Sequence, residues 1–440
     1  MIGTKRTGAC ALVLVALMAP GGVAAQLPRG NVATRGPITL DDIYSRVRRQ
    51  NARLAAAHAR TLAVAAQEPS AGLLPDPVLQ LGVMNVSLPG LRADMPSSMV
   101  PAVQLMQMLP FPGKLGLSGQ IAKQTTAMAE LESAESWWEV RSRAAMAFYE
   151  LYEADRQIEV MQETLGLLRD FERVAKAMYA SGEGRQSDVL RASVEVARMD
   201  AEIQRMRAMR AGAVARLNGL LNQPADSPVA AVALAPLPAE LPPPDTLRQW
   251  AEASRPMLAR GRVSLEQAGT RRALARRELW PDLTFGLQYG QRAGEMGTER
   301  MGSAMVGFSL PVFAAKRQLR MRDEAAAMEQ MAHADFADMR AVVNARVSEL
   351  LADLERDRTL LRLYRTDVLP QARATVEAAF SSYRVGTVDF MTLVDARMTV
   401  NGFEQEFYAL LADYGRAVAE LEMTVGREMP ASHALLSEVS

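Results

Sequence analysis

The sequence predicts a mainly α-helical protein with a small β part, built twice from two strands followed by two long helices. The composition supports long helices, because Ala, Arg, Glu, Leu and Met dominate long proline-free stretches while aromatic residues make up only 5%. The chain also repeats itself at an offset of 204 residues, with Tyr179 matching Tyr383 and Gly182 matching Gly386. Short segments of alternating polarity interrupt the helical pattern at the corresponding place in each half.

The repeat extends upstream with small shifts in register. Pro75-Asp76 matches Pro281-Asp282, Leu109-Pro110 matches Leu310-Pro311, and Lys114 matches Lys316. We therefore predict a signal peptide at residues 1–25, a first repeat at 26–223, a Pro/Ala-rich linker at 224–244, a second repeat at 245–428 and a C-terminal tail at 429–440.

The amino terminus and the charge balance exclude several classes of protein. Lys5 and Arg6 precede an apolar run, and the small residues Val23-Ala24-Ala25 follow it, which is typical of a secretory signal peptide. Cys10, the one cysteine, would be removed with it, so disulfides, cysteine-bound zinc and a thiol nucleophile are not expected. Fifty basic and fifty acidic residues give no net charge, which argues against general nucleic-acid binding.

Each repeat begins with a helix-start signal. Thr39 and Asp42 have capping-box spacing, and Pro244 suits the first turn of a helix. Four strands are predicted, at about residues 78–88, 99–108, 283–290 and 304–310. In residues 283–290 Leu, Phe, Leu and Tyr alternate with polar residues or glycine, which predicts one apolar face. The Gly/Arg/Glu-rich stretch between the last two strands is predicted to be a loop.

Long helices follow each strand pair. Apolar residues recur in steps of four and three from Val140 to Leu168 and from Phe336 to Leu354, which predicts coiled-coil packing. Gly166 and Pro370 occupy equivalent positions and weaken a helix, so we expect a bend or break at each. The chain then turns near residues 179–184 and 383–388 and returns as a second helix.

Four strands cannot close a barrel. Each unpaired backbone group in hydrocarbon costs several kcal/mol, so strands that span a membrane must leave no free edge. If these strands enter a membrane, several protomers must therefore pool them.

The signal peptide, the duplicated halves, the segment Leu109-Pro110-Phe111-Pro112-Gly113-Lys114 and a Tyr-x-x-Gly turn in both halves resemble the TolC-like outer-membrane efflux factors. The resemblance implies a homotrimer in which four strands per protomer form a twelve-stranded β-barrel in outer-membrane lipid. The helices would continue as an α-barrel across the periplasm. It also implies a periplasmic adaptor and an inner-membrane efflux pump as partners. Because no catalytic motif is found, we expect no enzymatic activity and no cofactor.

The resemblance also implies a periplasmic aperture at the two helical turns. Asp188, Tyr383 and Asp395 match residues that hold the closed end, and Tyr179, Gly182 and Gly386 are the turn residues expected to contact the adaptor. Val388 and Thr392 replace the family's aperture Arg and first second-turn Asp, although Arg185 or Arg384 can substitute for the Arg. The structural alternative is that Tyr383 packs the turn, the glycines adopt positive φ, and Asp188 caps the returning helix.

Cargo is left open by the sequence. The Pro-Phe-Pro-Gly-Lys segment looks like the CusC/CzcC heavy-metal branch, and thioethers bind Cu(I) well. The alternative is that methionine serves here only as an apolar residue, because the chain contains 26 methionines. The methionines near the first strand pair are Met84, Met95, Met99, Met106 and Met108. Metal cations are the expected cargo, with drugs or other small organic molecules as the alternative.

A periplasmic coiled-coil scaffold or adaptor is a further possibility from a different class. Such a protein would explain the heptads and the signal peptide but not the two strand pairs. The three histidines lie far apart in the sequence, and no catalytic or metal-ligand motif is present. Carboxylates on the amphipathic helices are expected on solvated faces.

Overall fold

The computed structural model describes residues 37–85, 98–234, 236–294 and 297–430. The predicted signal peptide at 1–25, Met95, and most of the tail predicted at 429–440 lie outside these residues. The described residues belong to one compact unit, Gly36–Ser440, in which strands and helices alternate twice in the same order.

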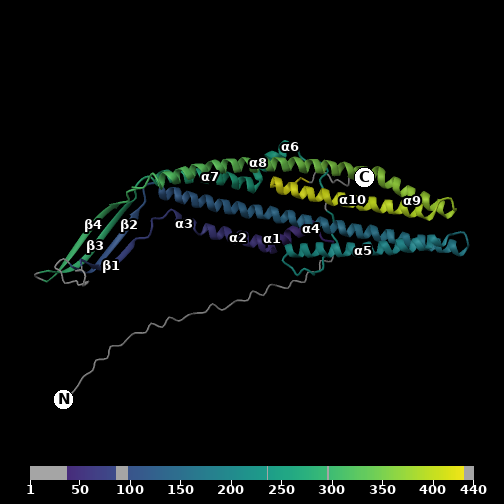
Figure 1. The fold of residues 1–440 in the computed structure, drawn as a ribbon, viewed down its shortest axis with the longest axis horizontal. Helices are drawn as coiled ribbons and strands as arrows, with labels where there is room; N and C mark the ends of the chain where they lie inside the picture. The colour runs from purple at the N-terminus through teal and green to yellow at the C-terminus, as the bar shows by residue number, and fades with distance from the viewer. Residues whose placement is uncertain (1–36, 86–97, 235, 295–296, 431–440) are drawn as a thin grey trace, which may run out of the picture. The chain divides into compact units, whose positions relative to one another are not determined.

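Both halves contain short helices, two strands and long helices, as the sequence predicts (Figure 1). The first half comprises α1 (Leu40–Gln50), α2 (Ala52–Ala65), α3 (Glu68–Ala71), β1 (Val78–Met84), β2 (Met99–Leu109), α4 (Lys114–Ala180) and α5 (Gln186–Leu220). The second half comprises α6 (Pro244–Ser254), α7 (Pro256–Arg277), β3 (Leu283–Gly294), β4 (Gly297–Phe308), α8 (Gln318–Leu363), η1 (Tyr364–Val368), α9 (Leu369–Arg384) and α10 (Phe390–Val425).

The predicted helix starts are confirmed. Thr39 is the N-cap of α1, and its hydroxyl accepts a hydrogen bond from the Asp42 backbone N–H at 3.3 Å. The Asp42 carboxylate accepts one from the Thr39 backbone N–H at 3.2 Å, which completes the capping box. Helix α6 begins at Pro244, where the missing N–H of proline costs no hydrogen bond.

A break at Gly166 is wrong, because α4, which is 67 residues long, continues through this position. A helix-interior glycine costs only about 1 kcal/mol, and Leu165 and Leu168 on either side are buried in the core. The irregularity expected at Pro370 is confirmed. A π-helical turn, Tyr364–Val368, separates α8 from α9 there, and π-turns relieve the backbone contacts that an interior proline would strain.

The predicted coiled-coil seam forms the core. Val140, Ala144 and Leu151 of α4 are fully buried, as are Val347 and Leu354 of α8. Helix α4 packs against α5, α7 and α10, and α8 packs against α7 and α10. The core therefore joins helices of both halves along their length, while the sheet lies at one end of the helices and the two helical turns at the other (Figure 1).

The four strands form one antiparallel sheet in the order β1-β2-β3-β4, so that β2 and β3 join the two halves. Strands β3 and β4 are longer than predicted and pair up to Gly294 and Gly297, so most of the expected loop is strand. An ion pair between Arg292 and Glu299, at 2.7 Å, supports this extension across the ladder. Strand β4 ends at Phe308, and residues 86–88 of the first predicted strand lie outside the described residues.

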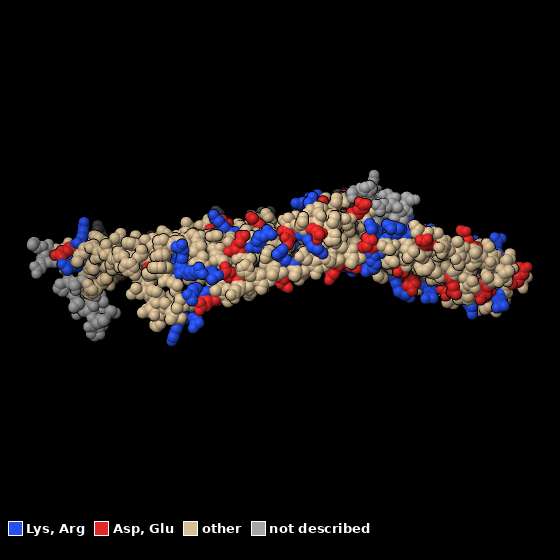
Figure 2. Space-filling view, turned by 90° about the horizontal axis from the view of Figure 1, so that it is seen from above, with Lys and Arg blue, Asp and Glu red and all other residues tan. Residues whose placement is uncertain are grey.

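The two faces of the sheet differ in composition. Paired positions share a face, so one face carries Leu79, Leu105, Leu287 and Phe308, which are largely exposed apolar side chains. Charged residues in the four described strands are confined to Arg292, Glu299 and Arg300, next to the β3–β4 turn. In Figure 2, side chains of both charge signs are scattered over the helices. An uncharged surface separates them from the charged end of the β3–β4 hairpin. None of the described helices is long and apolar enough to cross a membrane.

Candidate functional site

The two helical turns lie next to each other at the end of the helices away from the sheet (Figure 1). One apolar cluster contains residues from both, including Phe171 and Ala192 around the first turn and Phe390 and Leu393 around the second. The expectation that the turns come together is therefore met within a single chain.

Both turns have the predicted backbone. Gly182 and Gly386 adopt positive φ angles of 80° and 74°. The Gly182 N–H donates to the Tyr179 carbonyl at 3.1 Å, and the Gly386 N–H donates to the Tyr383 carbonyl at 3.0 Å. These left-handed residues end the descending helices in the way that glycine permits without strain.

Tyr383 packs the second turn. Only 4% of the residue is exposed, and its ring meets that of Phe390 edge to face, with centroids 5.5 Å apart. Its hydroxyl has no hydrogen-bond partner within the described residues. Burial raises the pKa of Tyr383, and the negative charge of Asp188 raises this pKa further.

The two predicted aspartates lie in different environments. Asp188 is half-buried in the first turn of α5, where a carboxylate suits the positive end of the helix dipole. It does not cap α5, because Arg185 occupies the N-cap position and makes no side-chain capping bond. Asp395 is exposed on α10, and within the described residues no hydrogen bond or ion pair joins it to Asp188 or Tyr383.

Asp389 is a turn residue that the sequence analysis does not single out. It is the N-cap of α10 and accepts hydrogen bonds from the Thr392 backbone N–H at 2.9 Å and hydroxyl at 2.6 Å. These bonds lower the pKa of Asp389, and the charges of Arg191 and Arg185 in the first hairpin lower it further. The spacing of Asp389 and Thr392 before an apolar run is the signal that would have found it. Val388, at the place of the family's aperture Arg, packs against the apolar cluster.

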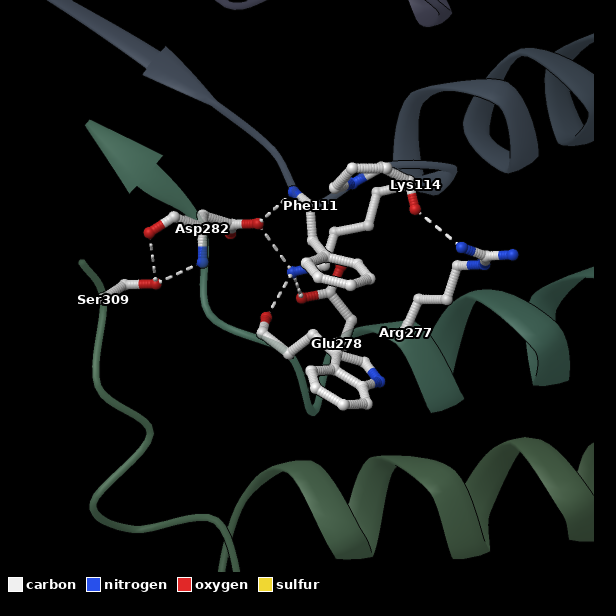
Figure 3. A network of polar contacts seen from close by, with 8 residues as sticks. Phe111, Lys114, Arg277, Glu278, Asp282 and Ser309 are labelled. Atoms are coloured by element: carbon white, nitrogen blue, oxygen red, sulfur yellow. Dashed lines mark hydrogen bonds and ion pairs between the residues drawn. The ribbon is translucent and has the colours of Figure 1, made fainter. Parts of the chain in front are cut away.

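A second polar network lies where the sheet meets the helices (Figure 3). We call the side chains of Phe111, Lys114, Glu278, Trp280 and Asp282 the junction network. The Lys114 ammonium, which is almost fully buried, donates to the Asp282 carboxylate at 2.8 Å and to the Glu278 carboxylate and Trp280 carbonyl at 3.2 Å each. The Asp282 carboxylate also accepts from the Phe111 backbone N–H at 2.8 Å. These contacts satisfy a buried charge with several partners.

Apolar and backbone contacts complete this junction. The rings of Phe111 and Trp280 stack with centroids 5.2 Å apart. Arg277 donates to the Pro112 carbonyl at 2.6 Å and lies so close to Gly113 that a Cβ atom there would collide with its guanidinium. The junction thus joins the end of β2 in the first half to the start of β3 in the second.

A third cluster is buried between α4, α9 and α10. The Arg397 guanidinium donates to the Thr164 hydroxyl at 2.7 Å, and this hydroxyl bonds Asn401 at 3.1 Å. Glu404 pairs with Arg373 at 2.7 Å and with Arg397 at 3.7 Å. Burial lowers the pKa of Arg397, while the charge of Glu404 opposes this shift. Within the described residues, no group of three or more His, Cys, Asp or Glu is placed to hold a metal ion.

Comparison with known proteins agrees with this architecture. Residues 247–427 match the family model of the outer membrane efflux protein. No curated protein matches the chain. Among solved structures, the outer-membrane channel OprN has 17% identity and a TM-score of 0.75, with 88% of this chain and 89% of OprN covered.

Two further structures have the same fold. CusC, whose structures concern folding and transmembrane channel formation, has 16% identity and a TM-score of 0.76 over 88% of this chain and 92% of CusC. The outer membrane protein VceC from Vibrio cholerae has 18% identity and a TM-score of 0.76 over 88% of this chain and 96% of VceC. The protein thus has the fold of outer-membrane channels. The family match in its second half and this fold confirm the resemblance to the TolC-like outer-membrane efflux factors.

Proposed function

We propose that the protein is the outer-membrane duct of a tripartite efflux system, a passive channel and not an enzyme. The observation that carries the proposal is the sheet, whose strands are uncharged except beside one turn and present one predominantly apolar face. Its outer strands, β1 and β4, are edges in the single chain. Such a sheet suits a lipid environment only when those edges are paired.

The number of strands per protomer suggests how the assembly closes. Three protomers with four strands each make the twelve-stranded barrel of a homotrimer, in which every edge finds a partner. Helix α4, at 67 residues, is about 100 Å long at 1.5 Å per residue, which suits a wall across the periplasm. A periplasmic adaptor and an inner-membrane pump would meet this wall at the helical turns and supply the energy for transport.

Membrane fractionation tests the duct against the periplasmic scaffold. A duct stays in the outer-membrane fraction after salt and alkali washing and migrates as a heat-sensitive trimer. Purified protein in planar bilayers would then form ion-conducting channels. A protein released by washing, or a detergent monomer that keeps its full strand content, would contradict the duct and favour the scaffold.

For cargo we propose metal cations, in particular soft ones. All six methionines of the described strands lie on the face opposite the apolar Leu/Phe/Tyr side chains. They are Met84, Met99, Met106, Met108, Met301 and Met305. The apolar face contains no methionine in the described strands, so leucine and methionine are not used interchangeably here. Thioethers prefer Cu(I) and related soft cations.

The methionines are also arranged with glycines and glutamines. Met106 and Met305 flank Gly286, and the Met99 side chain lies over Gly290, so each glycine leaves room for a thioether beside it. A barrel with this face inward would present thioethers to its interior.

Gene deletion followed by complementation tests the cargo. We expect deletion to lower copper and silver tolerance, and Met106→Leu/Met305→Leu to restore tolerance less well than wild type. Leu287→Met on the opposite face is the matched control and should restore it fully. Unchanged tolerance of copper, silver, zinc, cobalt and cadmium together with increased sensitivity to organic toxicants would make drugs or other organic molecules the cargo.

We also propose that Asp188, Tyr383 and Asp395 line the periplasmic aperture. Two observations support this proposal. The charge of Asp188 raises the pKa of Tyr383, and the Tyr383 hydroxyl forms no hydrogen bond with any described residue. Tyr179, Gly182 and Gly386 would form the adaptor-contacting tips, and Tyr179 is exposed there.

Single-channel conductance tests whether these residues restrict the periplasmic aperture. Asp188→Ala combined with Tyr383→Phe should raise the conductance in planar bilayers, because both groups that can hold the closed end are removed. Lys176→Ala, an exposed residue of the same hairpin, is the control. A wild-type conductance in a variant that is still trimeric would leave these residues only a structural role.

A further inference from the structure

The junction network has a counterpart that one chain leaves incomplete. In the sequence repeat, Lys316 corresponds to Lys114 and Asp76 corresponds to Asp282. The apolar pair is also repeated in kind, since Phe313 follows β4 as Phe111 follows β2, and Leu74 precedes Pro75 as Trp280 precedes Pro281. Four of the five residues of the junction network therefore have a counterpart, whereas Gly72 stands at the position of Glu278.

These counterparts are exposed and unpaired. Lys316 and Asp76 are both exposed, and neither has an ion pair within the described residues. Phe313 is 75% exposed, whereas its counterpart Phe111 in the complete junction is half-buried. Leu74 and its counterpart Trp280 are both exposed, so the contrast between the two junctions lies in the phenylalanine and in the lysine. Each side of the missing junction thus presents one charged and one large apolar side chain, with opposite charges on the two sides.

Sheet order keeps the two sides apart in one chain. Asp76 precedes β1 and Lys316 follows β4, and these strands are the opposite edges of the sheet with β2 and β3 between them. Neighbouring strands lie about 4.8 Å apart, so three strand spacings separate the edges by more than a lysine can reach. One chain therefore cannot bring the start of its β1 next to the end of its β4, whereas a neighbouring copy can supply the missing side.

We propose that a second copy of this chain completes the junction, with Lys316 of one protomer paired with the partner's Asp76 and Phe313 packed on the partner's Leu74. The proposal rests on the homotrimer proposed above and names the contacts that close it. The trimer would contain three internal junctions and three between protomers.

The internal junction also fixes the register of the new strand pair. Leu109 pairs with Leu283 at the β2–β3 junction, and the repeat equates these positions with Leu310 and Pro77. Phe308 then lies opposite the partner's Leu79, and Val306 lies opposite the partner's Leu81. Phe308 and Val306 already share the apolar face of the sheet with Leu79 and Leu81. This register therefore continues the apolar face across the interface without a break.

Charge exchange in the full-length protein tests the pairing. Lys316→Asp alone and Asp76→Lys alone should each lower the temperature at which the trimer dissociates in detergent, because like charges then face each other in all three interfaces. The double variant Asp76→Lys/Lys316→Asp should recover much of this loss. Lys176→Asp, a charge change on the exposed surface of α4, should leave the dissociation temperature unchanged.

Cross-linking gives an independent readout. Cys10 is the one cysteine of the sequence and precedes the predicted cleavage site, so Asp76→Cys/Lys316→Cys introduces the reactive thiols of the mature chain. A short bifunctional maleimide should link the double variant into covalent dimers and trimers, and the single-cysteine variants should stay monomeric on denaturing gels. Absence of both cross-links and charge rescue in a trimeric protein would overturn the pairing but not the duct. A protein that is monomeric in native detergent would instead overturn the duct.

Discussion

The two helical turns have the same backbone and different side-chain environments. Gly182 and Gly386 adopt nearly the same φ, but Tyr179 is 49% exposed while its repeat equivalent Tyr383 is 4% exposed. The first returning helix has no side-chain cap, and the second is capped by Asp389. The duplication has therefore preserved chain reversal in both turns, whereas only the second is fixed by a buried ring and a charged cap.

The largest expected effect is that of removing the buried ring. Tyr383→Ala should destabilise the second turn by about 3 kcal/mol, as for other buried aromatic residues. Hydrogen exchange measured by mass spectrometry over residues 378–396 would show the loss of protection. Tyr179→Ala is the matched variant and should change exchange little, so equal effects in both turns would remove the difference between them.

Substitution of the turn glycines should affect both turns alike. Gly182→Ala and Gly386→Ala each force a side chain into the left-handed region, at a cost of about 1–2 kcal/mol. The thermal unfolding midpoint by circular dichroism measures this cost. Gly212→Ala, inside α5, should be neutral or stabilising, because alanine favours the helix and no close contact opposes it. A clear difference between the two turn variants would mean that their backbones are not equivalent.

The cap of the second turn should respond to pH. The folded-state pKa of Asp389 lies below its usual value of 3.8, so its stabilising contribution is complete at neutral pH and is lost as the pH falls below that value. Exchange over residues 389–396 should therefore increase in acid. Asp389→Asn retains a capping oxygen that does not titrate and should reduce this dependence, and the uncapped first turn should not show it. An unaltered pH profile in Asp389→Asn would contradict the assignment.

The smallest effect is expected for Tyr383→Phe. The hydroxyl is buried without a partner among the described residues, so its removal should leave stability unchanged or raise it by up to about 1 kcal/mol. Thermal unfolding of the trimer measures this change. A marked loss of stability would show that the hydroxyl has a partner in the assembled protein, for which Asp188 of a neighbouring protomer is the first candidate.

Much of the fold follows from periodicity. The seam from Val140 to Leu168, the capping box at Thr39 and the apolar face of β3 are local patterns, and the structure has them. The continuity of α4 through Gly166 was not predictable from local sequence, because it depends on the burial of Leu165 and Leu168, which outweighs the weak helix preference of glycine. The longer β3–β4 hairpin includes a cross-strand ion pair between residues for which the sequence predicted a loop.

The polar sites were harder to predict than the helices. The positive φ of the two turn glycines was visible in the Tyr-x-x-Gly repeat, but the junction network requires contacts between residues 164 or more positions apart. Charged residues at helical spacing were expected to be solvated, which is wrong for Glu404 and Glu422. Each is buried beside an arginine supplied by another helix, and sequence spacing along one helix does not reveal such a partner.

The position of β2 and β3 in the sheet has a consequence for how the chain acquires its structure. Short helical segments form from neighbouring residues within about a microsecond, but the Phe111–Asp282 contact beside the β2–β3 ladder closes a loop between positions 171 apart. Loop closure of that length and strand pairing between distant segments are slow. The β1–β2 and β3–β4 hairpins are local, so β2 and β3 are the strands that wait longest for each other, and their unpaired edges expose the newly made chain to aggregation.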